Sequence, residues 1–176
     1  GSGGEPTQWT DGDWDDRAPT WSPDSRSIAY VSHHRDDRDL VPFNEAYVVP
    51  ASGGESVLWS EQLTEVVGMA WSPGGDQLAV IGSGDERIGA SWQGGVFILT
   101  QGEPPQRVSA DDVKPNGGFP PIAPAQEMRW TDDGRLLFIG DKRGESFVFE
   151  IDVASGETRK TDAGGWELQA IAFNRD

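Results

Sequence analysis

The amino-acid sequence predicts an all-β fold, and two observations support this prediction. The apolar runs are short and lie between turn formers, with 23 Gly and 12 Pro in 176 residues, which is typical of strands and turns rather than long helices. One hairpin pattern also occurs three times, as PTWSPDSRSIAYVS (19–32), MAWSPGGDQLAVIG (69–82) and MRWTDDGRLLFIG (128–140). A repeated strand–turn–strand unit predicts a repetitive antiparallel architecture.

The turn of the first hairpin has the sequence SPDS, Ser22–Ser25. Proline presets φ at about −65° in the second turn position, and aspartate bonds to the nearby backbone. The fourth position favours φ > 0, which Gly75 and Gly134 adopt without steric cost in the other two hairpins. Ser25 occupies this position in the first hairpin, so we expect it to be left-handed and mildly strained.

The second strand of each hairpin is apolar on both faces. Side chains alternate along a strand, so Ile28 and Tyr30 point one way, and Ala29 and Val31 the other. Residues 78–81 and 136–139 repeat this arrangement. A strand with one hydrated face would carry polar residues at every second position. Each sheet is therefore expected to pack between two neighbouring sheets.

A second hairpin follows each first one, at 45–60, 95–109 and 146–161. Each unit therefore holds four antiparallel strands, and an aromatic residue marks the same position in successive units. These anchors are Trp21, Trp71, Trp130 and Phe173, and the tryptophans are predicted to belong to the core. Four-stranded units that are covered on both faces predict the blades of a β-propeller.

The repeat also predicts how the chain is divided. We expect one propeller segment of three full blades plus a strand from each flanking blade. Residues 1–10 are the last strand of a preceding blade, and 166–176 are the first strand of a following one. The full blades are expected at 18–60, 67–109 and 126–161, with the proline-rich stretch 114–126 as an extended connection. An open arc exposes apolar sheet faces, so the isolated chain is expected to self-associate.

The charge balance restricts the partners. The chain has 30 acidic and 14 basic residues, a formal net charge of −16, so nucleic acid and anionic membranes are unfavourable partners. It has no cysteine, which excludes disulfides and thiolate metal sites and fits a cytoplasmic location. We expect no cofactor.

The repeat resembles a known family. WSPDSRSIAYVS followed by VVPASGGE is similar to the propeller repeat of TolB-type proteins and of the prolyl-oligopeptidase (S9) superfamily. The longer stretches GGEPTQWTDGDWDDRAPTWSPDSRSIAYVS and DRDLVPFNEAYVVPASGGE look most like the acylaminoacyl-peptidase branch. That resemblance implies a propeller that precedes an α/β-hydrolase domain with a Ser-Asp-His triad, caps the active site and admits peptides by size. The implied partners are the rest of the propeller, the hydrolase domain and peptide substrates.

The chain itself is expected to carry no catalytic residue. The nucleophile elbow of α/β-hydrolases reads Gly-x-Ser-x-Gly, and the nearest match, GASWQ (89–93), lacks the closing glycine. Ser91 is therefore interpreted as a polar loop residue. His33 and His34 are adjacent and should point to opposite faces, which gives no triad. The alternative function is a TolB-like binding module without enzyme activity, which would be periplasmic.

Two charged insertions carry the candidate contacts with substrate. The first, 33–45, contains Arg35 and Arg38, and the second, 82–95, contains Arg87 and Trp92. An arginine there is suited to bind a peptide carboxylate, although solvated loops with internal Arg–Asp pairs explain the same sequence.

The stretch DGDWDD (11–16) spaces its carboxylates as a calcium loop does. It lacks the glycine at position 6 and the glutamate at position 12 that an EF-hand needs. We therefore expect no metal there, with a calcium-binding propeller loop as the alternative, and interpret Asp15 and Asp16 as contacts with Arg17 or with the backbone of the next blade.

Overall fold

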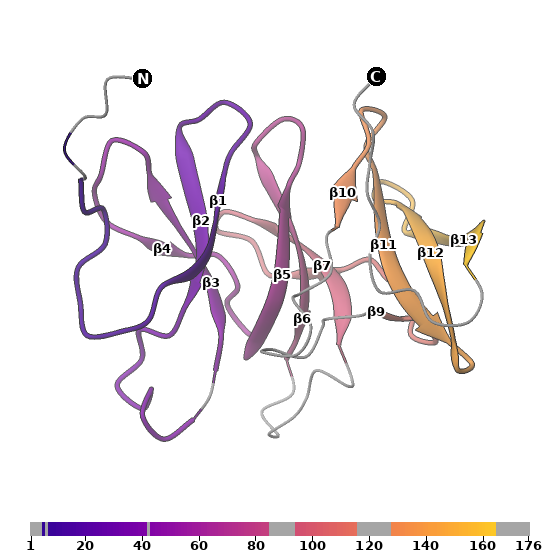
Figure 1. Ribbon diagram of the computed structural model, residues 1–176, viewed down its shortest axis with the longest axis horizontal. Coiled ribbons are helices and arrows are strands. Elements are labelled where there is room, and N and C mark those ends of the chain that lie inside the picture. Colours follow the sequence, from indigo (N-terminus) through magenta and orange to yellow (C-terminus); the bar gives the residue numbers. More distant parts are fainter. Residues whose placement is uncertain (1–4, 6, 42, 85–93, 116–127, 165–176) are drawn as a thin grey trace.

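The computed structural model describes residues 5, 7–41, 43–84, 94–115 and 128–164, and Figure 1 shows three sheets arranged side by side. The first sheet contains β1 (Arg17–Trp21), β2 (Ser27–Ser32), β3 (Glu45–Pro50) and β4 (Val57–Leu58). The second contains β5 (Glu65–Trp71), β6 (Gln77–Ser83), β7 (Gly95–Thr100) and β8 (Gln106–Arg107). In both, the strands are antiparallel neighbours in chain order, which confirms the predicted four-stranded units.

The third sheet has one strand more than expected. It contains β10 (Arg129–Trp130), β11 (Arg135–Lys142), β12 (Glu145–Asp152) and β13 (Glu157–Gly164), and β9 (Lys114–Pro115) also pairs with β11. Both β9 and β10 lie along the edge of β11 that faces away from β12. The innermost strand is thus built from two short pieces. Lys114 and Pro115 belong to the sheet, not to the extended connection that the prolines suggested.

The remaining predicted boundaries fall partly outside the described residues. The first two sheets run from 17 to 58 and from 65 to 107, close to the predicted blades at 18–60 and 67–109. Residues 5 and 7–16 contain no strand. The predicted final strand, 166–176, lies outside the described residues. Within the described ranges, no helix is long and apolar enough to span a membrane.

The turns have the predicted backbone geometry. Ser25 has φ of 58°, while Gly75 and Gly134 have φ of 74° and 80°, so the left-handed assignment of the fourth turn position is confirmed. The aspartate also acts as expected, because Asp24 Oδ1 accepts hydrogen bonds from the Ser22 hydroxyl at 2.7 Å and the Arg26 amide at 3.0 Å.

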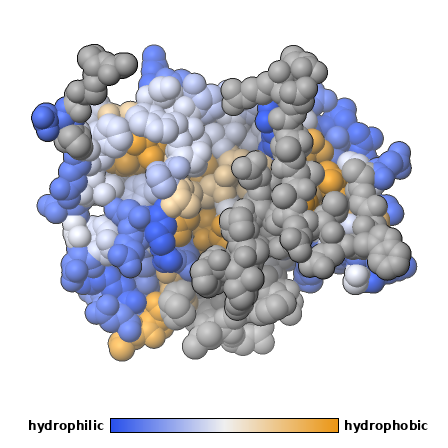
Figure 2. All heavy atoms as spheres, in the orientation of Figure 1, coloured by the Kyte–Doolittle hydropathy of each residue, from blue (hydrophilic) through white to orange (hydrophobic). Residues whose placement is uncertain are grey.

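Two layers of the core lie between consecutive sheets, and a third buried cluster, of Ile28, Tyr30, Tyr47 and Val49, lies on the other face of the first sheet. Leu78 and Val80 of β6 pack in the layer shared with the first sheet, whereas Ala79 and Ile81 pack in the layer shared with the third. All four side chains are buried, which confirms that the strand is apolar on both faces because both faces are covered. Figure 2 shows mainly hydrophilic residues on the visible surface, with small hydrophobic areas between them.

The repeated tryptophans connect neighbouring sheets. Trp71 Nε1 donates to the Thr20 carbonyl at 3.1 Å, and Trp130 Nε1 donates to the Ala70 carbonyl at 3.0 Å. Trp71 is 8% exposed, as expected for a core residue, but Trp21 is 50% exposed. The prediction that Trp21 belongs to the core is wrong, because no described sheet lies beyond it.

Candidate functional site

Long connections gather at one end of the molecule. The turns 22–26, 72–76 and 131–134 are short and lie at the top in Figure 1. The connection 33–44 between β2 and β3 lies at the opposite end, together with the segment 11–16 that leads into β1. In repeat folds, insertions on one face often form the binding surface, so a functional site is expected at this end.

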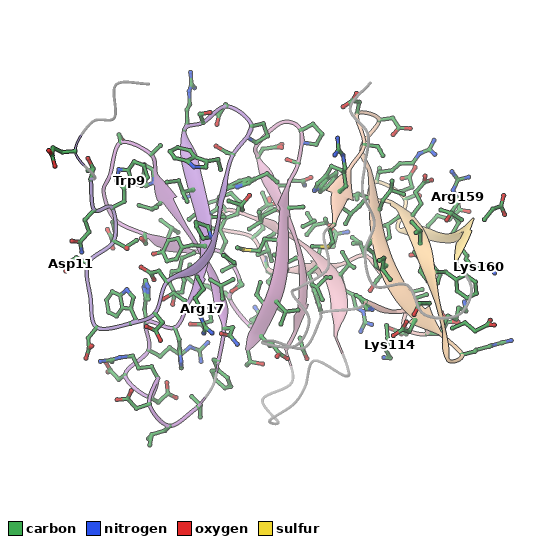
Figure 3. All side chains as sticks on the ribbon, in the orientation of Figure 1. Trp9, Asp11, Arg17, Lys114, Arg159 and Lys160 are labelled. Carbon is green, nitrogen blue, oxygen red and sulfur yellow. The ribbon has the colours of Figure 1, made fainter. Side chains whose placement is uncertain are left out.

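A cavity of about 510 Å³ opens between the segment before β1 and the connection 33–44. This volume falls within the range of small-ligand pockets, about 300–1,000 Å³. Figure 3 shows Arg17 at this lower end of the first sheet. The residues that line the cavity are Gly12, Asp13, Trp14, Asp15, Arg17, His33, Arg38, Asp39, Val41, Phe43 and Asn44.

Two arginines stand in the wall of this cavity. Arg38 Nε donates to the Asp13 carbonyl at 2.9 Å, and its Nη2 lies 3.5 Å from Asp13 Oδ2. Arg17 Nη2 donates to Asn44 Oδ1 at 2.8 Å. A guanidinium has five N–H donors, and among the described residues these contacts use only some of them. Both arginines therefore retain N–H donors for a ligand.

Arg35 has a different environment, and it does not line the cavity. Its Nη2 and Nε lie 2.5 Å and 2.8 Å from Glu45 Oε1, and Glu45 is fully buried. The hydrogen bond to Glu45 raises the pKa of Arg35. Its guanidinium also lies over the Phe43 ring, 5.3 Å from the centroid. Arg35 therefore neutralises a buried carboxylate at the start of β3.

An aromatic stack that the sequence did not predict lies next to the cavity. The His34 ring lies between Trp14 and Tyr47, with centroid distances of 4.1 Å and 3.9 Å. Burial lowers the pKa of His34, although Asp16, with Oδ1 3.7 Å from Nε2, opposes the shift. Burial also raises the pKa of Tyr47, whose hydroxyl donates to Glu45 Oε2 at 3.0 Å.

His33 and His34 meet different carboxylates, as their opposite directions predict. His33 Nε2 lies 3.6 Å from Asp37 Oδ1, whereas His34 is near Asp16. The only sequence signal for the stack is the polar His-His pair directly after a buried strand. Trp14 and Tyr47, which stack on His34, are 33 residues apart in the chain. The sequence alone does not indicate that these two rings lie close together.

The acidic stretch 11–16 makes contacts within the first blade. Asp13 pairs with Arg38, and Asp16 lies beside His34. Arg17 donates to Asn44, and among the described residues it makes neither of the ion pairs with Asp15 and Asp16 that the sequence suggested. Among the described residues, no group of three or more His, Cys, Asp or Glu side chains is placed to hold a metal ion. Arg87 and Trp92, the other two candidate contacts, lie outside the described residues, as does Ser91.

Comparisons with known proteins identify the architecture. No protein-family model matches the sequence, and no curated protein matches it. Among solved structures, a puromycin-hydrolyzing peptidase of Mycobacterium tuberculosis superposes with a TM-score of 0.64 at 16% identity, over 94% of this chain and 25% of that one. TolB from Acinetobacter baumannii superposes with a TM-score of 0.55 at 11% identity, over 90% of this chain and 35% of that one. The chain has the β-propeller fold of these proteins.

A third similar structure extends the range of functions found on this fold. An oligogalacturonate lyase in complex with manganese superposes with a TM-score of 0.58 at 14% identity, over 86% of this chain and 42% of that one. The propeller segment thus spans about a quarter of the length of the peptidase and under half of the other two proteins. Because one fold serves a peptidase, TolB and a lyase, function has to be argued from the site.

Proposed function

We propose that this propeller segment is a non-catalytic part of an S9-type serine peptidase of the acylaminoacyl-peptidase or dipeptidyl-peptidase kind. Its role is to control peptide access to a hydrolase domain outside this chain. The single observation that carries the proposal is the cavity at the loop-bearing end, where Arg17 and Arg38 present unused donors. The similarity of the repeat to the S9 superfamily and the superposition on a puromycin-hydrolyzing peptidase support it.

Within this role, Arg38 is the residue proposed to contact substrate. Arginine binds carboxylates through paired N–H groups, and Arg38 reaches the cavity from the connection 33–44. Arg35 is better suited to hold Glu45 in place. Arg87 and Trp92 remain candidate substrate contacts in the second insertion. We also propose that the parent protein is located in the cytoplasm.

Peptide binding to the chain tests this role. N-acetylated tetrapeptides with a free C-terminal carboxylate are titrated by calorimetry, with C-terminal amides as controls. Arg38→Gln should raise Kd for the carboxylate peptides at least about tenfold, since a hydrogen bond to a charged group is worth about 1.5–3 kcal/mol. Arg26→Gln is the matched control, because Arg26 lies in the short turn at the opposite end and its side chain is 85% exposed.

Three results would count against the proposal. Equal affinity for carboxylate and amide peptides would show that Arg38 does not bind the C-terminal carboxylate of the substrate. Hydrolysis of small amide substrates by the chain alone would contradict its non-catalytic role, as would a coding sequence without a hydrolase domain nearby.

The second candidate is a TolB-like interaction module without enzyme activity, located in the periplasm. The superposition on TolB favours it. It predicts that folded proteins bind the loop-bearing end and that short peptides do not.

A further inference from the structure

The innermost strand of the first sheet is irregular next to the cavity. The register of β1 against β2 shifts between Arg17 and Thr20, so that two residues of β1, Ala18 and Pro19, stand opposite one residue of β2. This arrangement is a β-bulge. Ala18 has φ of 50°, a left-handed backbone that residues with a side chain rarely adopt.

The bulge determines the face of the sheet on which Arg17 lies. Arg17 and Thr20 are three residues apart, so in a regular strand they would point to opposite faces. The extra residue instead places them opposite Val31 and Ala29, two residues of the apolar layer between the first and second sheets. Residues directly opposite each other share a face, so Arg17 leaves the strand on the side of the second sheet.

Asn44 meets the Arg17 side chain on that side. Its Oδ1 accepts a hydrogen bond from Arg17 Nη2 at 2.8 Å. Its backbone is joined to the second sheet, because its N–H donates to the Thr64 carbonyl at 3.0 Å and the residue forms a parallel bridge with Glu65. Both Arg17 and Asn44 line the cavity. The guanidinium is therefore held in the cavity wall by its own strand and by a residue fixed to the neighbouring sheet.

The left-handed backbone at Ala18 is not a requirement of the repeat. The spacing of Trp21 and Trp71 places Gly68 at the position of Ala18. The strand β5 also changes register near this point, between Val66 and Gly68, yet Gly68 has no positive φ. The second sheet thus has the residue that could adopt this backbone without strain and does not use it. Strained backbone that a fold does not require is typical of functional sites.

We propose that the bulge at Ala18 and Pro19 positions Arg17 as a second ligand-binding arginine of the cavity. Arg17 donates to the peptide carboxylate together with Arg38. Ala18 and Asn44 are positioning residues that act through Arg17. Among the described residues, the bond to Asn44 uses one of the five N–H donors of this guanidinium, and the others remain for the ligand. The choice of ligand rests on the proposed function, whereas the orientation of Arg17 by the bulge does not.

Calorimetric titration with the carboxylate peptides tests the proposal. Arg17→Met should raise Kd at least about tenfold. Ala18→Val should raise Kd to a similar extent, because a β-branched residue does not adopt the left-handed backbone and the bulge has to rearrange. Ala18→Gly preserves this backbone without strain, so it should leave Kd within about twofold and raise Tm by about 1–4 °C. Ala154→Val is the matched control, because Ala154 is exposed between β12 and β13 and has no positive φ.

The double variant Arg17→Met/Ala18→Val distinguishes positioning from a general loss of structure. If Ala18 acts through Arg17, the double variant should bind the peptide no more weakly than Arg17→Met alone. Asn44→Ala removes the acceptor of the Arg17 hydrogen bond, so it should also raise Kd and should add nothing to Arg17→Met. Ala18→Leu serves in place of Ala18→Val if the valine variant does not fold.

The proposal is overturned by wild-type affinity in Ala18→Val, or by an additive loss of affinity in the double variant. It is also overturned if neither Ala18→Val nor Ala18→Leu folds, since the bulge would then serve the fold rather than Arg17.

The orientation of Arg17 can be measured without a ligand, in case the wild-type chain shows no preference for carboxylate peptides and the proposed function fails. Asn44→Ala should lower Tm by about 2–4 °C in the wild-type chain, because one hydrogen bond is lost, and by less than about 1 °C in Ala18→Val, where Arg17 no longer reaches Asn44. An equal fall of Tm in both proteins would show that Ala18 does not position Arg17.

Discussion

Arg35→Met should destabilise the protein strongly, although Arg35 lies in a surface connection. The substitution leaves the carboxylate of Glu45, which is fully buried, with the Tyr47 hydroxyl as its remaining described partner. Removing one member of a buried pair costs about 3–5 kcal/mol because the other charge stays desolvated. The Arg35 side chain is 42% exposed, so water can reach the position that it vacates. We therefore expect a loss of about 3 kcal/mol, the lower end of this range.

That free energy corresponds to a fall in Tm of about 6–12 °C, since 1 kcal/mol shifts Tm by about 2–4 °C in a chain of this size. Thermal unfolding at pH 7 measures it. The double variant Arg35→Met/Glu45→Gln should regain most of the loss, because the buried charge is then absent.

Arg38→Met is the matched control for this prediction. Arg38 is in the same connection, but its partner Asp13 has a fully exposed side chain, and exposed ion pairs contribute about 0–1 kcal/mol. The reasoning is refuted if Arg35→Met lowers Tm no more than Arg38→Met does, or if Glu45→Gln gives no recovery.

Three further measurements test the turns, the tryptophan contacts and the histidine stack. Ser25→Gly should stabilise by about 0.5–1 kcal/mol in urea unfolding, because glycine relieves the left-handed strain, whereas Gly134→Ala should destabilise by about 1 kcal/mol. Trp130→Phe should lower the free energy of unfolding by about 1 kcal/mol, because the hydrogen bond to the Ala70 carbonyl is lost. An unchanged free energy of unfolding would show that this hydrogen bond does not stabilise the protein. His34 has a lowered pKa, so the unfolded chain binds its proton more tightly. Stability should therefore be full above pH of about 6.5 and decrease below it, and His34→Phe should flatten this dependence.

The sequence was sufficient to predict the repeating part of the fold. Residues 78–81 alternate between two apolar layers, and the turn chemistry of SPDS specifies φ > 0 at Ser25. Both features are local, and each is repeated along the chain, so one unit supports the interpretation of the next. The position of β9 was not predictable in this way, because residues 116–127 separate it from β10 and prolines hide its strand character.

The candidate site was predictable only in part. The connection 33–44 was recognised as an insertion that carries arginines, but the sequence did not distinguish Arg35 from Arg38. That distinction depends on Glu45, which could be exposed or buried at the start of a strand. It also depends on the segment 11–16, whose Asp13 meets Arg38 at the cavity. Such contacts depend on tertiary packing rather than on local pattern.

The stabilising contacts between sheets and the proposed binding cavity lie at different parts of the first sheet. The tryptophan hydrogen bonds and both apolar layers lie between sheets, so substitutions such as Trp71→Phe act on nearest-neighbour contacts, as in other repeat folds. The cavity lies at the strand ends. The connection 33–44 joins the second sheet through the bridge between Asn44 and Glu65, but the Arg38 guanidinium pairs with the exposed Asp13. A change at Arg38 should therefore alter ligand preference with little loss of stability, whereas Arg35, in the same connection but joined to the buried Glu45, should show the reverse.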